Sequence, residues 1–230
     1  MLNGKTVLIA GGSSGIGLAV ARLAAENGAR VVIASRHAAE NTSRLTDALG
    51  PAAEAYALDV TSDESVQRLH LAVGAIDHLV IAVRPDAQRA PFLETPLDRA
   101  KSAFETKVWG TCRLIRAAHP HVRTGGSITL TSGIAGEKTY PGAFAMALAN
   151  GAVETLCRSL AVELAPVRVN AVSPGFVEPK PQEVQDYAAA RFPAKRLATA
   201  REIAAAYLYL MTSLYATGTV VTVDGGARLI

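Results

Sequence analysis

The sequence has little of three things that would indicate a specialised class of protein: cysteine, clustered positive charge and long apolar runs. Two cysteines, Cys112 and Cys157, are too few for a disulfide framework or a four-thiolate zinc site. The 23 Lys and Arg against 20 Asp and Glu leave a net charge of +3 without a basic cluster, which argues against a nucleic-acid-binding protein. No apolar stretch approaches about 18 residues, so no segment is expected to cross a membrane.

Apolar residues, in contrast, make up 50% of the 230 residues, and charged residues only 19%. This composition can fill one large core and excludes a disordered chain. The length suits one α/β domain, and we expect a single domain over residues 1–230. The first residues lead directly into a predicted strand, which leaves no room for a signal peptide. We therefore expect a cytoplasmic protein.

Short β-branched runs alternate along the chain with longer segments of helical periodicity. This alternation predicts a doubly wound α/β fold, a parallel sheet of seven strands with helices on both faces. A stretch at Ser173–Arg196 with four prolines is predicted to be irregular and to form a lid over a site. The predicted strands are Thr6–Ala10, Arg30–Ser35, Ala55–Asp59, His78–Val83, Ser127–Thr131, Val167–Val172 and Thr219–Val223. The predicted helices are Gly15–Asn27, Ser62–Val73, Pro96–His119, Ala143–Ala165 and Arg201–Leu214.

A glycine-rich turn, residues 11–17, joins the first predicted strand to the first predicted helix. Such a turn lets backbone N–H groups approach a pyrophosphate, and the start of the helix adds roughly half a positive charge. Many turns are rich in glycine, but this one follows the first strand of an alternating β/α pattern. The position of the turn therefore predicts a dinucleotide-binding site.

The spacing Gly11-x-x-x-Gly15-x-Gly17 resembles that of the short-chain dehydrogenase/reductase family, and the resemblance extends over nearly the whole chain. The matching motifs include Leu58-Asp59-Val60, Asn170-Ala-Val-Ser173-Pro174-Gly175 and Asp224-Gly225-Gly226. The resemblance implies a Rossmann fold, oxidoreductase activity on a small-molecule substrate, and a nicotinamide cofactor. It also implies a homodimer or homotetramer that forms through the two long helices.

The end of the second predicted strand, Ser35-Arg36, carries the residues that distinguish NADP(H) from NAD(H). An acidic residue at this place binds a ribose hydroxyl, whereas an arginine accommodates a 2′-phosphate. Arg36, with Ser35 and Ser13 as neutral donors, therefore favours NADP(H) over a surface role for this arginine. The resemblance implies that Asp59 binds the adenine amino group and that Val60 contributes its backbone, although Asp59 also suits a helix cap. The predicted cofactor-binding residues are Gly11, Ser13, Ser14, Gly15, Ile16, Gly17, Ser35, Arg36, Asp59, Val60, Asn150, Pro174, Gly175 and Val177.

The catalytic positions differ from those of the family that the sequence resembles, whose members use an Asn, a Ser, a Tyr and a Lys. Here the Asn position holds Lys107, the Ser position Gly133, the Tyr position Met146 and the Lys position Asn150. Ser132 stands one residue before the serine position, and a shift of one residue turns a strand side chain to the other face. The sequence therefore predicts a non-standard active site.

Four residues are the candidates for catalysis in such a site. Lys107 lies on the buried stripe of its helix, where a lysine is costly unless it pairs or its pKa falls. It could stabilise an oxyanion, donate a proton or bind the ribose, or it could make only a structural bond to a backbone carbonyl. Asn150 could donate to the ribose hydroxyls or join two helices. Tyr140 is a substitute acid or a packing residue, and Ser132 could offer its hydroxyl to the substrate.

We therefore expect an NADP(H)-dependent reductase that acts on a carbonyl or an iminium group of a small, partly apolar substrate. An NADP(H)-binding pseudoenzyme or sensor, and a non-redox cyclase or isomerase on the same fold, are the alternatives. The five histidines show no metal-ligand spacing and are predicted at the surface or at helix ends, so no metal site is expected.

Overall fold

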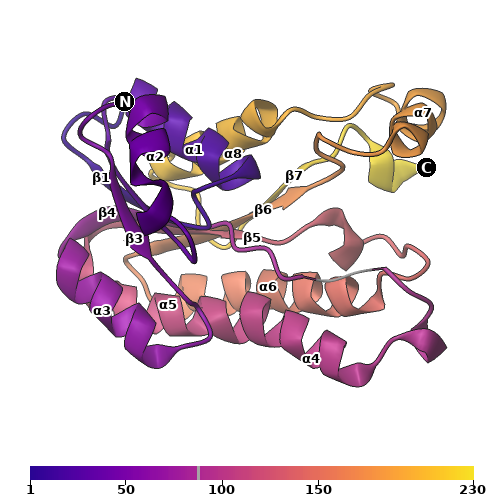
Figure 1. The fold of residues 1–230 in the computed structure, drawn as a ribbon, viewed down its shortest axis with the longest axis horizontal. Helices are drawn as coiled ribbons and strands as arrows, with labels where there is room; N and C mark the ends of the chain where they lie inside the picture. The colour runs from indigo at the N-terminus through magenta and orange to yellow at the C-terminus, as the bar shows by residue number, and fades with distance from the viewer. Residues whose placement is uncertain (87–88) are drawn as a thin grey trace.

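The computed structural model describes residues 1–86 and 89–230 and has a seven-stranded parallel sheet at its centre (Figure 1). The strand order is β3-β2-β1-β4-β5-β6-β7, so the winding direction reverses between β1 and β4. Sheets of this kind bind ligands at that reversal, beyond the carboxyl ends of the strands. The strands are β1 (Thr6–Ala10), β2 (Arg30–Ser35), β3 (Glu54–Ala57), β4 (Ile76–Ile81), β5 (Val122–Thr131), β6 (Arg168–Pro174) and β7 (Val220–Val223).

Helices cover both faces of the sheet, with α1, α2 and α8 on one face and α3 to α6 on the other (Figure 1). In the fully buried strand β1, Leu8 and Ala10 belong to the core under α3, α5 and α6, whereas Val7 and Ile9 belong to the core under α1 and α8. Alternation with a period of two residues therefore builds both cores. The helices are α1 (Gly15–Glu26), α2 (Thr42–Leu49), α3 (Asp63–Val73), α4 (Leu97–Phe104), α5 (Gly110–Ala118), α6 (Phe144–Glu163), α7 (Gln182–Arg191) and α8 (Ala200–Thr212).

The doubly wound α/β fold with seven parallel strands is confirmed. Several predicted elements differ from the observed ones at their end residues, and two predicted segments differ by more than that. The predicted helix Pro96–His119 is not one continuous α-helix, because a π-helical turn at Glu105–Trp109 separates α4 from α5. The predicted irregular stretch Ser173–Arg196 contains the helix α7, which begins directly after Pro181, a position that suits the start of a helix.

One histidine differs from its prediction, and a second lies at a helix end but is buried. His78 lies within β4, is buried, and places its Nδ1 2.9 Å from the hydroxyl of Ser127 on β5. His70 is at the end of α3, as predicted, but it is buried and stacks on the ring of His121. Both side chains therefore belong to the packed interior and not to the surface. No helix among the described residues is long and apolar enough to span a membrane.

Candidate active site

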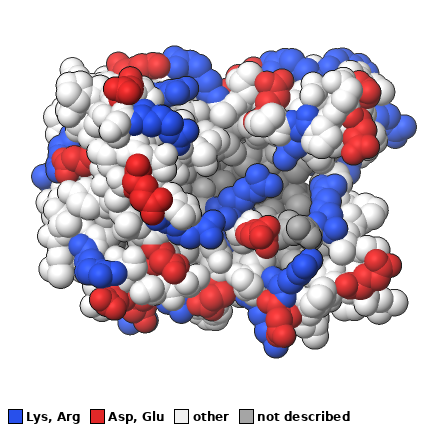
Figure 2. Space-filling view, in the orientation of Figure 1, with Lys and Arg blue, Asp and Glu red and all other residues white. Residues whose placement is uncertain are grey.

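A cavity of about 1070 Å³ opens beyond the carboxyl ends of the central strands. Figure 2 shows it as a hollow on this face of the molecule, with Lys and Arg side chains at its edges. Every residue predicted from the sequence to bind the cofactor lines this cavity, and so do the four catalytic candidates. The fold therefore brings together residues that are far apart in the chain, from Gly11 after β1 to Val177 after β6.

The glycine-rich turn packs too tightly against its neighbours for side chains at two positions. A Cβ on Gly11, whose φ is +82°, would lie 2.6 Å from the carbonyl oxygen of Ala82, directly after β4. A Cβ on Gly17 would lie 2.1 Å from the carbonyl oxygen of Gly11. The N-cap residue of α1, Ser14, makes no side-chain hydrogen bond to the helix. The first turn of α1 thus keeps N–H groups for an anion, as a pyrophosphate site requires.

The end of β2 forms a second, polar corner of the cavity. The Ser35 hydroxyl donates to the Ser13 hydroxyl at 2.8 Å, and the exposed Arg36 follows directly. Arg44, on α2, donates from Nη2 to the carbonyl oxygen of Ser13 at 3.2 Å. The sequence reasoning missed Arg44 because it did not predict α2. The corner therefore offers the hydroxyls of Ser13 and Ser35 and the guanidinium group of Arg36, and Arg44 is bonded to the backbone beside it. Such a donor set is suited to a phosphate.

Asp59, which follows β3, accepts two hydrogen bonds at the edge of the cavity. The Thr61 hydroxyl donates to Asp59 Oδ1 at 2.7 Å and the Thr61 N–H donates to the same atom at 2.9 Å. These bonds, with a smaller contribution from the Arg36 charge, lower the pKa of Asp59. The carboxylate is therefore ionised at neutral pH and is held in place for a donor on a ligand.

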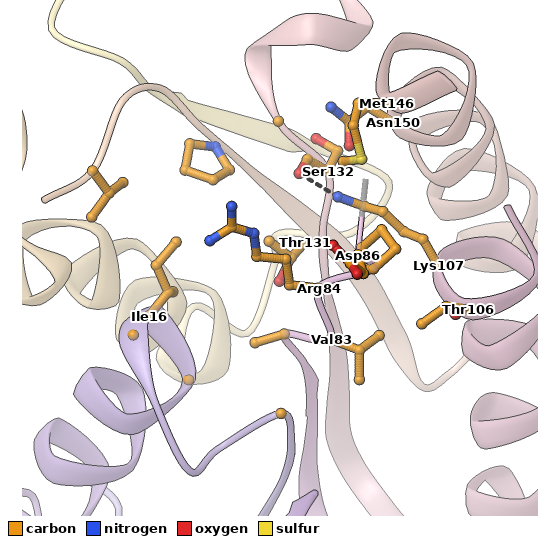
Figure 3. Close-up of a pocket in the computed structure, with 18 of the residues that line it drawn as sticks. Ile16, Val83, Arg84, Asp86, Thr106, Lys107, Thr131, Ser132, Met146 and Asn150 are labelled. Atoms are coloured by element: carbon orange, nitrogen blue, oxygen red, sulfur yellow. Dashed lines mark hydrogen bonds between the residues drawn. The ribbon is translucent and has the colours of Figure 1, made fainter. Parts of the chain in front are cut away.

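Lys107 lies in the π-helical turn and is only 5% exposed. Its ammonium group donates to the carbonyl oxygen of Ser132 at 3.0 Å, and Figure 3 shows this bond at the end of β5. Burial, aided by the positive charge of Arg84, lowers the pKa of Lys107 to about 8, while Glu154 opposes this shift. A buried ammonium with such a pKa can donate a proton near neutral pH.

The other catalytic candidates surround this ammonium in different ways. The Ser132 hydroxyl donates to the Val172 carbonyl oxygen at 3.4 Å. Lys107 binds the backbone carbonyl oxygen of Ser132 and not this hydroxyl. Asn150 is buried on α6, and its Oδ1 has no partner among the described residues. The buried Tyr140 hydroxyl also lacks a described partner. Burial raises the pKa of Tyr140, which makes it a weaker acid than an exposed tyrosine.

Four charged residues of the site had no role in the sequence reasoning. Arg84, after β4, points into the same space as Lys107 (Figure 3). Glu154 lies one turn after Asn150 on α6, and burial raises the pKa of its carboxyl group. Arg89 and Lys180 line the cavity from loops. Helical spacing from Asn150 could have indicated Glu154, whereas the two loop residues carry no local signal.

Comparisons with known proteins agree with this geometry. Residues 10–228 match the family model described as enoyl-(acyl carrier protein) reductase. A short-chain dehydrogenase/reductase of Stachybotrys chlorohalonatus is 34% identical over 99% of this chain and 98% of its own length. The 3-oxoacyl-[acyl-carrier-protein] reductase of Rattus norvegicus is 31% identical, with 98% of each chain covered.

Solved structures give the same result. A small-chain dehydrogenase in complex with NADPH superposes with a TM-score of 0.86 at 31% identity, over 98% of this chain and 99% of its own. An NADPH-bound short-chain oxidoreductase of Pseudomonas aeruginosa PAO1, described as containing an atypical catalytic center, has a TM-score of 0.88 at 28% identity, over 96% of each chain. The chain is therefore an oxidoreductase of the short-chain dehydrogenase/reductase family, as its motifs predict.

Proposed function

We propose that the chain is an NADP(H)-dependent reductase of a carbonyl or iminium group in a small, partly apolar substrate. The observation that carries the proposal is the buried Lys107 ammonium, which faces the same cavity as the glycine-rich turn. NADPH, when bound, would supply the hydride. The protein's own part is to hold the cofactor, to exclude water and to place a proton donor at the reacting oxygen.

The residues present fit a phosphorylated dinucleotide. Gly11 and Gly17 leave room for a backbone that approaches a pyrophosphate, and Figure 3 shows Arg84 directed toward Ile16 at the start of α1. We assign Arg84 to the pyrophosphate, and Arg36 and Arg44 to the 2′-phosphate. The two NADPH-bound structural relatives support this cofactor.

Lys107 is the proposed proton donor. Its pKa of about 8 leaves it largely protonated at neutral pH, so it can stabilise a developing oxyanion and then give up a proton. Met146, at the position of the family's tyrosine, carries no proton to donate, and Tyr140 is the weaker acid of the two remaining candidates. An iminium substrate would need no proton at all, and Lys107 would then act on the cofactor ribose.

The cofactor assignment predicts the effect of replacing Arg36 with alanine. We expect the affinity for NADPH to fall about 10- to 100-fold, because charge-assisted hydrogen bonds to the 2′-phosphate are lost. The affinity for NADH, which lacks that phosphate, should stay within about twofold. Fluorescence titration of both nucleotides measures the two values. Equal losses for NADPH and NADH would contradict the assignment.

One observation also suits a second candidate, an NADP(H)-binding protein without turnover. The bond from Lys107 to the Ser132 carbonyl oxygen would serve a purely structural lysine equally well. NADPH oxidation with a panel of aldehydes, ketones, quinones and imines separates the two functions. The reductase consumes NADPH with at least one class, the binding protein with none, and a cyclase or isomerase on this fold forms product without consuming NADPH.

We also propose that the chain forms a homodimer or homotetramer through α4, α5 and α6. Large apolar side chains are exposed in this region, with Trp109 53%, Leu148 61% and Val162 79% exposed. Light scattering should give a mass that is two or four times the 24.0 kDa of one chain. Replacing Leu148 with aspartate should yield monomers, because a carboxylate is costly in an apolar interface. A wild-type protein that elutes as a monomer would overturn the proposal.

A further inference from the structure

Two of the cations that line the cavity have no acidic partner among the described residues. Arg89 and Lys180 both line the cavity, and neither forms an ion pair with any residue in the described part of the chain. The cavity is also lined by the carboxylates Asp59, Asp86 and Glu178, yet none of them forms an ion pair with these cations. Unpaired cations gathered at one place are expected to attract an anion.

The two cations line the same cavity, and the charge of Arg89 acts on Lys180. Lys180 is half-buried, and its pKa is lowered by burial first and then by the charges of Arg84 and Arg89. No carboxylate contributes an opposing effect on this lysine. Like charges at close range raise the free energy of the empty site, and a bound anion would remove that cost.

The cofactor accounts for Arg84 but not for Arg89. Arg84 is directed toward Ile16, where we place the pyrophosphate (Figure 3). Arg89 lies instead over two aromatic rings, with its Cζ 5.6 Å from the ring centroid of Tyr140 and 5.9 Å from that of Phe176. These rings pack edge to face against each other at 5.7 Å. The aromatic pair thus forms an apolar wall beside Arg89.

The hydroxyl group of Tyr140 is a second sign of a ligand at this place. It is buried and has no hydrogen-bond partner among the described residues, although Tyr140 lines the cavity. A buried hydroxyl without a hydrogen-bond partner destabilises the protein, and a hydrogen bond to a ligand oxygen would remove that cost. The aromatic wall, the free hydroxyl and the two cations together match an apolar molecule that carries an acidic group.

We propose that Arg89, Lys180 and the Tyr140 hydroxyl bind an anionic group of the substrate, either a carboxylate or a phosphate monoester. This inference rests on the proposed function, because it names the substrate class of the same site. The substrate is then an oxo acid or a phosphorylated ketone. Its carbonyl carbon gains the hydride, its oxygen gains the proton, NADPH becomes NADP⁺, and the anionic group stays unchanged.

Calorimetric titration of the NADPH-loaded protein with unreactive probes tests the proposal without turnover. The probes are cyclohexanecarboxylate, cyclohexyl phosphate and the neutral cyclohexanecarboxamide. At least one of the two anions should bind about 10-fold more tightly than the carboxamide, and the tighter one identifies the anionic group. Arg89→Gln and Lys180→Met should each lower the affinity for that anion about 10-fold. The affinity for the carboxamide should stay within about twofold.

The control is Arg191→Gln, which removes an exposed arginine of α7 that does not line the cavity and should change neither affinity. Equal binding of the anions and the carboxamide would overturn the proposal. The proposal would also be overturned if Arg89→Gln and Lys180→Met lowered the affinity for NADPH and left the affinity for the anionic probe unchanged. Arg89 and Lys180 would then bind the cofactor. Anion binding without NADPH oxidation by any carbonyl or imine compound would instead refute the proposed reductase and leave the anion site standing.

Discussion

Replacing Lys107 with methionine is expected to lower the turnover number for NADPH-dependent reduction at least about 100-fold. The side chain keeps nearly its length and apolar stem, but the ammonium that faces the cavity and binds the Ser132 carbonyl oxygen is gone. The dissociation constant of NADPH should change less than about threefold, since the phosphates lie elsewhere in the cavity. Steady-state kinetics and fluorescence titration measure the two effects separately. A matched control is Lys101→Met, which removes an exposed lysine of α4 and should leave turnover unchanged.

The role of Lys107 as proton donor also predicts how turnover depends on pH. The pKa of Lys107 is about 8, so the protonated donor predominates below that pH and is lost above it. Turnover in the reducing direction should therefore be level near pH 7 and fall about tenfold per pH unit well above pH 8. Lys107→Arg keeps its charge throughout this range and should remove the decline, at a lower absolute rate. A Lys107→Met variant with wild-type turnover would remove this residue from the mechanism.

The second large effect is expected from a single methyl group in the glycine-rich turn. In Gly17→Ala the new Cβ would lie 2.1 Å from the carbonyl oxygen of Gly11, where ordinary contacts begin at 3.4 Å. The turn must therefore move by about 1 Å, and a displacement of that size at a binding site can cost about 100-fold. We expect the NADPH affinity to fall by this factor while the circular dichroism spectrum stays that of a folded α/β protein.

The control for this variant adds the same methyl group where space is open. Gly151, inside α6, has no atom within 4 Å of its Cβ position, so Gly151→Ala should leave the NADPH affinity unchanged. Its thermal unfolding temperature should rise slightly, because alanine is the better helix former. If Gly17→Ala bound NADPH as tightly as the wild type does, the turn would not be the pyrophosphate site.

Local patterns were sufficient to predict the sheet and the cavity. The run that forms β1 is buried on both faces and is therefore nearly continuous in apolar residues, whereas the buried strand β4 also contains Asp77 and His78. The residues placed in the cofactor site follow strands of one parallel sheet, whose carboxyl ends meet at one edge. The sequence therefore predicted the neighbourhood of Arg36 and Lys107, and the structure places both side chains in one cavity.

Features that depend on contacts distant in the chain were not predicted. Helix α2 has few apolar residues, so periodicity did not indicate it, and Arg44 was missed with it. The role given to Arg89 depends on its contact with Phe176, which is far away in the sequence. Burial raises the pKa of Tyr140, which argues against the role of substitute acid that its position near the catalytic helix suggested.

The π-helical turn Glu105–Trp109 has a consequence for the length of the chain at this point. A π turn holds one residue more than an α turn, so it shifts the phase of α5 relative to α4. Winding the same residues as one continuous α-helix, without the π turn, would rotate one half by about 100° against the other. The buried faces of α4 and α5 and the direction of Lys107 could then no longer all be kept. The π turn therefore lets both halves keep their buried faces although this stretch holds one residue more than an α-helix would need.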